Sequence, residues 1–380
     1  MTGYDEPKPG TVGRMAAETR TSLLSWTTLV PAVAFLALLA TWGRDIPPVV
    51  VGVVGLLLAG AVLAAVHHAE VVALRVGEPF GSLVLAVAVT VIEVALIVTL
   101  MISGDGAKTE SLARDTVFAA VMITCNGILG LCLLVATVRK QVAVFNAEGT
   151  GGALATVATL ATLSLVLPSF TTSRTGPEFS PGQLAFAALA SLAVYGVFVA
   201  VQTGRHRDYF LPVTRSGEVI DSEHAAPPSS KAALTSLGLL VLALVAVVGD
   251  AKAVSPTIES GVEKAGAPPS FVGVVIALLV LLPETLAAVR AARRDRVQTS
   301  LNLALGSSIA SIGLTIPAIA VATIWLSGPL VLGLGPTQIV LLVLTAVVGV
   351  LTVVPGRATL LQAGVHLALF GAFLFLAISP

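Results

Sequence analysis

The feature that most limits the fold of this chain is a series of apolar runs, each about 20 residues long, along almost its whole length. A helix needs about 20 apolar residues to cross the hydrocarbon core of a bilayer. Only 11% of the 380 residues are charged, whereas about a quarter are charged in a typical soluble domain. Alternating polar and apolar residues are scarce and aromatic residues make up 5%, which argues against an outer-membrane barrel. The sequence therefore predicts an all-α polytopic membrane protein.

Clusters of proline, glycine and charged residues divide the apolar sequence into eleven predicted transmembrane helices. The polar segment before the first span is longer than the basic start of a secretory signal, so we expect an uncleaved first helix. The predicted spans are 23–41, 48–66, 79–102, 115–138, 152–169, 182–202, 233–249, 270–290, 298–326, 335–354 and 358–378.

The distribution of charge predicts the orientation of the chain. Cytoplasmic loops of inner-membrane proteins carry an excess of Lys and Arg, and with eleven spans fifteen of the 21 basic residues fall on the side of the N-terminus. We therefore expect an inner-membrane protein with a cytoplasmic N-terminus and an external C-terminus. Eight carboxylates, among them Asp250, Glu259 and Glu263, are expected on the external side. The formal net charge of zero gives no reason to expect a nucleic-acid partner.

The longest hydrophilic stretch divides the chain after the sixth span. This segment, 204–232, is expected to be a cytoplasmic linker. Residues 1–46 then hold the N-terminal tail and first helix, 47–203 a first group of five helices, and 233–380 a second group of five. Because five is an odd number, two homologous halves of this size must have opposite orientations in the membrane, as in many secondary transporters.

The two predicted halves share a glutamate within an apolar helix. In both, a segment that begins with alanine ends seven residues later in a glutamate, Glu93 in the first half and Glu284 in the second. The next helix of each half supplies an asparagine followed four residues later by glycine; the asparagines are Asn126 and Asn302. Each glutamate lies level with its own asparagine, roughly 15 Å and 9 Å deep from opposite faces. We expect the four residues to converge near the midplane.

These residue types at this depth indicate ion binding. An ionised carboxylate in hydrocarbon costs several kcal/mol and is expected to face a partner or a wet cavity. No Lys or Arg lies deep enough in the membrane to pair with Glu93 or Glu284, so a cation or a proton must neutralise them. With oxygens from Asn126 and Asn302, the two carboxylates could supply the roughly six to eight oxygen ligands that Ca²⁺ prefers. Two alternatives to ion binding stay open. The glutamates could be neutral, hydrogen-bonded carboxyls, and the asparagines could serve only to join helices by hydrogen bonds.

Four further residues are expected to support this site. Pro283 has no N–H and is expected to leave the carbonyl of Leu279 unpaired beside the second glutamate. In the first half, Thr90 could offer a hydroxyl instead. Ser307 could line the ion path, although small residues more often pack in a helix interface.

Two pairs of motifs resemble the signature repeats of a known family. Segments 77–96 and 114–127 look like the first signature repeat of the calcium/cation antiporter superfamily, and segments 272–284 and 298–307 look like the second. The similarity, specifically to bacterial calcium/sodium:proton antiporters of the ChaA type, extends from the second span to the end.

The resemblance implies one N-terminal helix followed by two inverted five-helix repeats, with Glu93 and Glu284 as carriers of ions and protons. It implies extrusion of Ca²⁺ driven by inward proton flow, with Na⁺ or K⁺ as further substrates. Inorganic cations and the lipid bilayer are the expected partners, a homo-oligomer is compatible with the sequence, and no resident cofactor is expected. The Gly-Asn-Ala-x-Glu pattern and the acidic segment between the halves of plant and fungal relatives are absent. Regulation by an acidic helix is therefore not expected.

Three other functions remain open. The closest is a Na⁺(K⁺)/H⁺ antiporter on the same scaffold, because asparagine and backbone oxygens also bind Na⁺. A membrane-embedded enzyme is less expected, because the sequence has no His-Glu-x-x-His zinc motif and no paired-aspartate motif. A passive channel would carry an ion flux that ignores a pH gradient.

Overall fold

The computed structural model describes residues 25–44, 46–77, 80–103, 110–213, 227–325 and 328–380. Nine helices of this described part are long and apolar enough to cross a membrane, and a bent pair of shorter helices makes a tenth. The predicted all-α membrane class is therefore confirmed. Each of the eleven predicted spans overlaps a helix, but the first of these helices has only 16 residues.

The first half of the described chain consists of α1 (Trp26–Thr41), α2 (Pro48–Val76), α3 (Phe80–Ser103), α5 (Leu112–Met122), the π-helix η2 (Ile123–Ile128), α6 (Leu129–Lys140), β1 (Val142–Val144), α7 (Ala147–Ala161), η3 (Thr162–Val166), η4 (Leu167–Ser169), α8 (Pro181–Ala200), η5 (Val201–Arg205) and η6 (Arg207–Phe210). The second half consists of α9 (Ser230–Lys264), α10 (Phe271–Val280), α11 (Leu282–Arg293), α12 (Val297–Ala322), α13 (Pro336–Val353), β2 (Arg357–Thr359) and α14 (Leu360–Ile378).

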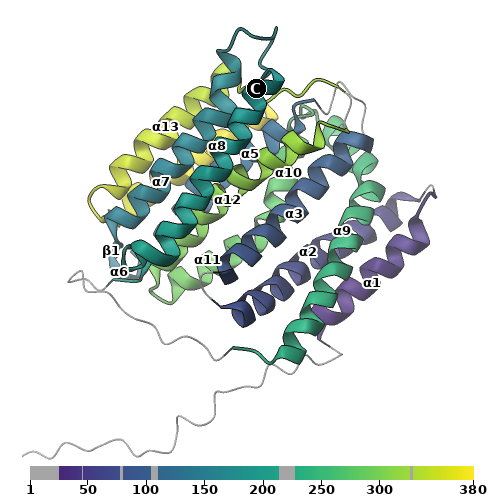
Figure 1. Ribbon diagram of the computed structural model, residues 1–380, viewed down its shortest axis with the longest axis horizontal. Coiled ribbons are helices and arrows are strands. Elements are labelled where there is room, and N and C mark those ends of the chain that lie inside the picture. The colour runs from purple at the N-terminus through teal and green to yellow at the C-terminus, as the bar shows by residue number, and fades with distance from the viewer. Residues whose placement is uncertain (1–24, 45, 78–79, 104–109, 214–226, 326–327) are drawn as a thin grey trace, which may run out of the picture.

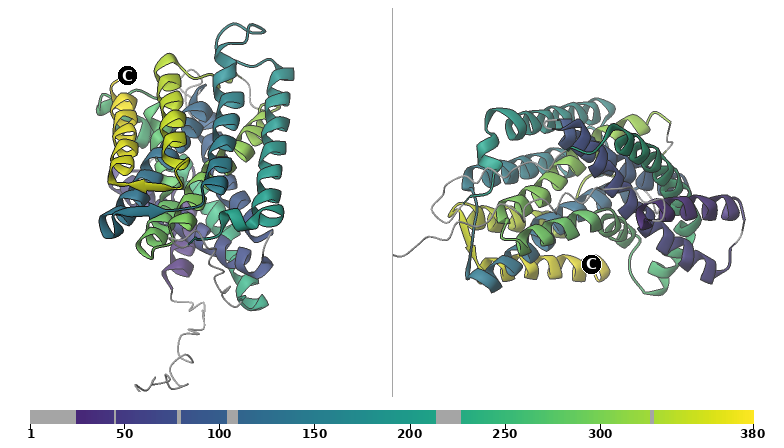
Figure 2. Two further views of the ribbon diagram at one scale, coloured as in Figure 1. Left: turned by 90° about the vertical axis from the view of Figure 1, so that its left-hand side faces the viewer. Right: turned by 90° about the horizontal axis from the view of Figure 1, so that it is seen from below.

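The helices that carry the predicted site residues lie in the middle of the bundle. Helices α1, α2 and α9 pack together at one edge, and α7, α8 and α13 lie at the other (Figure 1). Between them, α3 packs on α12, and α10 and α11 pack on α5 and α6. The left-hand view of Figure 2 shows that most helices run roughly parallel to one another. The predicted site is thus enclosed by protein on both sides.

Regular α-helix is interrupted in two of these central spans. The chain bends by 53° between α10 and α11, at Leu281. Pro283 lies in the first turn of α11, where its missing N–H costs no internal hydrogen bond. The span formed by α5 and α6 instead contains the π-helix η2, and π-helical turns are frequent at functional sites. Glu284 lies beside the first interruption and Asn126 lies within the second.

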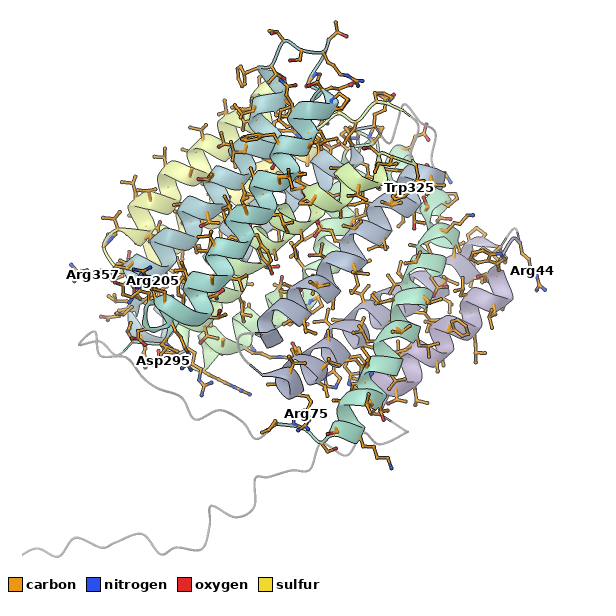
Figure 3. The ribbon with its side chains drawn as sticks, viewed as in Figure 1. Arg44, Arg75, Arg205, Asp295, Trp325 and Arg357 are labelled. Atoms are coloured by element: carbon orange, nitrogen blue, oxygen red, sulfur yellow. The ribbon has the colours of Figure 1, made fainter. Side chains whose placement is uncertain are left out.

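Basic residues gather at one end of the helices. Arg75, Arg205 and Arg357 lie at this end, whereas Arg44 lies at the other (Figure 3). The same end holds the ion pair between Lys140 and Asp295 and the small antiparallel sheet of β1 and β2. These basic residues, which the charge distribution assigns to the side of the N-terminus, thus lie at the same end of the structure.

Two helices are longer than predicted. The predicted span 48–66 belongs to a helix that continues to Val76, and the predicted span 233–249 belongs to one that continues to Lys264. Asp250 was expected in an external loop, but it lies buried within α9 with 0% of its surface exposed. Charged residues from this position onward favour a loop in the sequence, whereas in the structure α9 continues because it packs against α1 and α2.

The middle of the predicted linker, 214–226, lies outside the described residues.

One glycine allows the close packing of α10 on α5. A Cβ atom added at Gly273 would lie 2.8 Å from the backbone nitrogen of Thr116 and 2.9 Å from the carbonyl carbon of Asp115. Gly273→Ala is therefore expected to lower the free energy of unfolding by about 1–3 kcal/mol, because the two backbones must separate. The control is Gly238→Ala on α9, where an added Cβ meets nothing within 4 Å. Thermal unfolding in detergent checks the prediction, and equal unfolding temperatures for the two variants would contradict it.

Candidate ion-binding site

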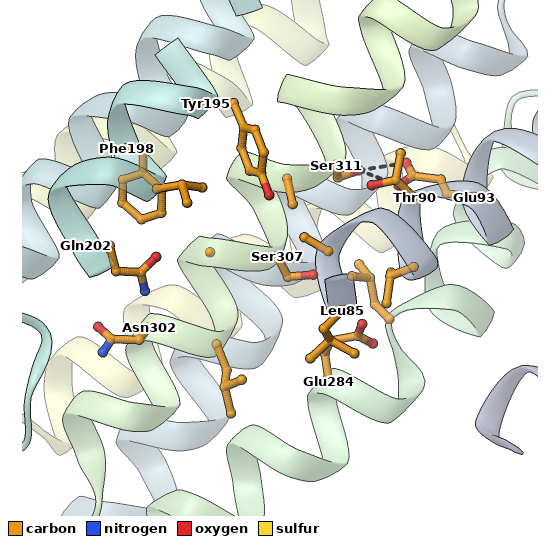
Figure 4. Close-up of a pocket in the computed structure, with 17 residues that line it drawn as sticks. Leu85, Thr90, Glu93, Tyr195, Phe198, Gln202, Glu284, Asn302, Ser307 and Ser311 are labelled. Carbon is orange, nitrogen blue, oxygen red and sulfur yellow. Dashed lines mark hydrogen bonds between the residues drawn. The ribbon is translucent and has the colours of Figure 1, made fainter. Parts of the chain in front are cut away.

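A pocket of about 170 Å³ lies among α3, α8, α11 and α12 (Figure 4). No Lys, Arg or His is among the described residues that line it. Its polar lining residues all carry oxygen atoms, the preferred ligands of hard cations. They are Thr90, Glu93, Tyr195, Gln202, Glu284, Asn302, Ser307 and Ser311.

Glu93 provides the first carboxylate of the pocket. Its helix, α3, is apolar around it, and only 3% of the glutamate is exposed. The Ser311 hydroxyl of α12 lies 2.6 Å from Oε1 and 2.8 Å from Oε2 and donates to this carboxylate. One hydroxyl has a single proton to donate. Lone pairs of the carboxylate therefore remain available to a cation or a proton.

Glu284 provides the second carboxylate. It lies in the first turn of α11, next to the bend, where the free N–H groups of a helix N-terminus favour negative charge. Its Oε2 is buried and has no hydrogen-bond partner in the described part of the chain. A buried carboxylate oxygen without a partner is costly unless it takes up a proton or binds a cation. Two other glutamates, Glu93 of α3 and Glu70 of α2, repel a negative charge on the Glu284 carboxylate.

Asn302 closes the end of the pocket that faces η6. Its Nδ2 donates to the carbonyl of Phe210 over 2.6 Å, and its Oδ1 accepts from Gln298 Nε2 over 2.8 Å. Gln298 in turn accepts from the backbone N–H of Asn146 over 2.6 Å. An amide oxygen has two lone pairs, so Asn302 can keep the bond from Gln298 and still offer Oδ1 to an ion.

The structure does not bring Asn126 into this pocket. Asn126 is fully buried in η2, where its Nδ2 donates to Thr345 Oγ1 over 2.9 Å. Its Oδ1 lies 3.1 Å from His366 Nδ1, and Nε2 of the same ring lies 3.0 Å from Thr352 Oγ1. Convergence of all four predicted residues is therefore not observed, because α13 and α14 supply the partners of this amide.

The predicted supporting residues fall into two groups. Thr90 and Ser307 line the pocket. Pro283 lies at the bend beside the second glutamate, but neither Pro283 nor Leu279 is among the lining residues. Leu281 lines the pocket instead, because the chain bends at that residue rather than one turn before the proline.

Three polar lining residues, Tyr195, Gln202 and Ser311, were not among the predicted site residues. From the sequence, Ser311 could line the ion path or pack in a helix interface, as Ser307 could, and its position on α12 nine residues after Asn302 does not distinguish the two. Tyr195 and Gln202 lie seven residues apart in a largely apolar span, so they share one helix face. That polar pair was the available signal. Figure 4 shows both side chains directed toward α12.

Comparison with known proteins agrees with this architecture. A family described as sodium/calcium exchanger protein matches residues 46–204 and 235–379. The protein y4hA of Sinorhizobium fredii, which is named provisionally as an ionic transporter, is 48% identical over 85% of this chain and 87% of its own length. The sodium-potassium/proton antiporter ChaA of Escherichia coli is 35% identical over 92% of this chain and 95% of its own.

A solved structure of the H⁺/Ca²⁺ exchanger CAX has the same fold. It superposes with a TM-score of 0.66 at 18% identity and covers 91% of this chain and 87% of its own. The resemblance inferred from the two motif pairs is thus confirmed. The chain belongs to the sodium/calcium exchanger protein family.

Proposed function

We propose that this protein is a secondary transporter that exchanges cytoplasmic Ca²⁺ for external protons at the pocket of Glu93 and Glu284. The observation that carries this proposal is the presence of both carboxylates in one pocket that no Lys, Arg or His lines among the described residues. Their charge must then be balanced by ions that enter the pocket. A proton or a cation can do this, and the two compete for the same oxygens.

The ligands available favour a divalent cation. Two carboxylates together match the charge of one Ca²⁺, and Asn302 adds an amide oxygen. Ca²⁺ accepts about six to eight oxygen ligands in a flexible geometry and tolerates water among them. Hydroxyl groups of Thr90 and Ser307 face the same pocket. The site can therefore complete a calcium shell with few changes of side-chain position.

A Na⁺(K⁺)/H⁺ antiporter is the second candidate. The specific observation in its favour is the 35% identity, over 92% of this chain, to a protein named as a sodium-potassium/proton antiporter. A monovalent cation would leave one carboxylate protonated, and the same pocket would serve. The exchange with protons is common to both candidates.

We further propose that the site opens alternately to the two sides through an inverted repeat of five helices. The packing supports this, because the glutamate helix of each half contacts the asparagine span of the other: α3 packs on α12, and α11 packs on α6 and η2. In an inner membrane, the basic end with Arg75 and Arg205 would face the cytoplasm. Arg44, just after α1, lies at the other end, so in this orientation the start of α1 would face the cytoplasm.

Everted membrane vesicles with an acidified interior test the proposed function. Ca²⁺, Na⁺ and K⁺ are added separately while proton efflux is followed with a fluorescent pH probe. Ca²⁺-dependent efflux is the expected result. A response to Na⁺ or K⁺ alone would replace the first candidate by the second, and a cation flux that ignores the pH gradient would indicate a channel.

Ser311→Ala is expected to raise the KM for the cation at least about tenfold, because a hydrogen bond to a charged group is lost. Ser308→Ala is the matched control: it lies on the same helix, is fully buried, and its hydroxyl has no partner in the described part of the chain. We expect this control to leave KM unchanged. Initial rates in the vesicle assay at several cation concentrations provide the comparison, and equal KM values for the two variants would exclude the role of Ser311.

A further inference from the structure

A further buried carboxyl within a membrane-spanning helix lies outside the ion pocket and is not used by the proposed exchange. Asp250 on α9 has 0% of its surface exposed, and both of its carboxyl oxygens lack a hydrogen-bond partner in the described part of the chain. Asp115 on α5 provides the contrast. It is also buried, at 4% exposure, but it receives hydrogen bonds of 2.8 Å from both Ser111 Oγ and Arg114 Nε.

The neighbours of Asp250 pack closely on α1 and α2, and a second pocket of about 440 Å³, with Arg44, Gly249 and Lys252 among its lining residues but not Asp250, lies beside them. At the preceding residue, Gly249, an added Cβ would lie 2.2 Å from Leu38 Cδ1 of α1, so α1 and α9 are in close contact here. One turn later, Val254 packs with Val51 and Val54 of α2. Neither Asp250 nor its neighbours belong to the pocket of the two glutamates. The aspartate is therefore separated from the proposed ion path.

No cationic side chain of the packed helices balances this carboxyl. Among described residues, α1 and α10 carry no titratable side chain; α2 carries His67, His68, Glu70 and Arg75, and α3 carries Glu93. The charged and titratable residues of α2 lie far from Asp250 along α9. His68 Nδ1 contacts Ser236 Oγ of α9, and Ser236 lies fourteen residues, or about 20 Å, before Asp250. Glu93 is bonded to Ser311.

The remaining charged groups lie on α9 itself. Lys252 lies over the Trp42 ring at 5.7 Å from its centroid, and Glu259 accepts a hydrogen bond from Ser255 over 2.9 Å. Lys231, Glu263 and Lys264 lie near the two ends of the helix. None of these residues forms an ion pair with Asp250.

An ionised carboxylate in such surroundings is strongly disfavoured, and a single bound proton removes its charge. A metal ion would need several further oxygen or nitrogen ligands, and no group of three or more His, Cys, Asp or Glu that could hold a metal occurs in the described residues. We infer that Asp250 is a second proton-binding site, separate from the pocket of Glu93 and Glu284, whose protonation holds α9 against α1 and α2. The proton on Asp250 does not depend on which cation the pocket carries.

Infrared spectroscopy of the purified full-length protein in lipid vesicles tests the inference. A protonated carboxyl shows a C=O stretching band that a carboxylate lacks. At neutral pH, Asp250→Asn is expected to remove part of this band, whereas Asp115→Asn, which changes a paired carboxylate, is expected to leave it unchanged. An unchanged band in Asp250→Asn would overturn the inference.

A second sample covers the case in which Asp250→Asn does not fold. In Glu93→Gln/Glu284→Gln, which lacks both pocket carboxyls, part of the band must survive at neutral pH and disappear as the pH is raised. Its absence in this variant would also refute the site. Neither measurement uses transport, so a failure here and a failure of the proposed exchange are distinguishable.

The stability of the protein gives an independent readout. The neutral carboxyl is the form compatible with burial, so raising the pH from neutral to alkaline is expected to lower the unfolding temperature of the wild type. Asp250→Asn removes the titrating group and should flatten this dependence, whatever its effect on the absolute unfolding temperature. Parallel curves for wild type and variant would count against a proton on Asp250.

Discussion

Glu284→Gln is expected to abolish cation-dependent proton flux while the protein still inserts and folds. Oε2 of Glu284 is buried without a partner in the described residues, so this carboxylate has the greatest need for an incoming proton or cation. Glutamine has nearly the same shape but can neither bind a proton near neutral pH nor add a negative charge to the site. Loss of even a second-shell partner commonly lowers metal affinity about 10- to 100-fold, and loss of a charged ligand should exceed that range.

The vesicle assay measures this loss, with the amount of inserted protein determined in parallel. Glu178→Gln is the control, because that glutamate pairs with Arg174 over 3.3 Å and does not line the pocket. The same loss is expected for Glu93→Gln, since both carboxylates are needed to balance a divalent ion. Substantial Ca²⁺/H⁺ exchange by Glu284→Gln would refute the proposed site.

The two glutamates could be found from the sequence because of their background. A charged residue in the middle of an apolar span is rare and costly, so Glu93 and Glu284 stand out without any knowledge of the fold. The two glutamates also occupy matching positions in two similar segments, which indicates that they belong to the same site. The structure places both in one pocket, although the binding of ions there remains a prediction.

The asparagines could not be placed in the same way. Counting residues from a predicted helix end gives the depth of Asn126 and Asn302 in the membrane, but it does not say which face of the helix each occupies. For Asn126 this face also depends on η2, because a π-helical turn rotates the following residues away from the α-helical period. The partners Thr345 and His366 lie more than 200 residues later in the chain, beyond the reach of local sequence patterns.

The extent of α9 was missed for a related reason. A hydropathy analysis ends a predicted span where charged residues begin, and Asp250 and Lys252 therefore place the end of this span near residue 249. In the structure, α9 runs on to Lys264, since a helix that packs along α2 does not have to end where its apolar sequence ends. The burial of Asp250 is therefore a tertiary effect, and the sequence alone places the residue in solvent.

The two asparagines are expected to respond differently to the same substitution. Asn302→Ala should raise the KM for the cation about tenfold or more, because it removes an amide oxygen from the pocket and frees α12 from the carbonyl of Phe210. Asn126→Ala should leave KM unchanged but lower the free energy of unfolding by about 1–2 kcal/mol, because Thr345 and His366 lose a buried partner.

Initial rates in vesicles and thermal unfolding in detergent, measured on both variants, separate the two roles. Each variant is the control for the other, since both truncate an asparagine of a helix that follows a glutamate helix. If Asn126→Ala raised KM as much as Asn302→Ala, both asparagines would have to reach the ion at some stage of transport. The pocket of this structure would then represent one state of the transport cycle. In another state η2 would bring Asn126 to the ion, as the four-residue site predicted from the sequence requires.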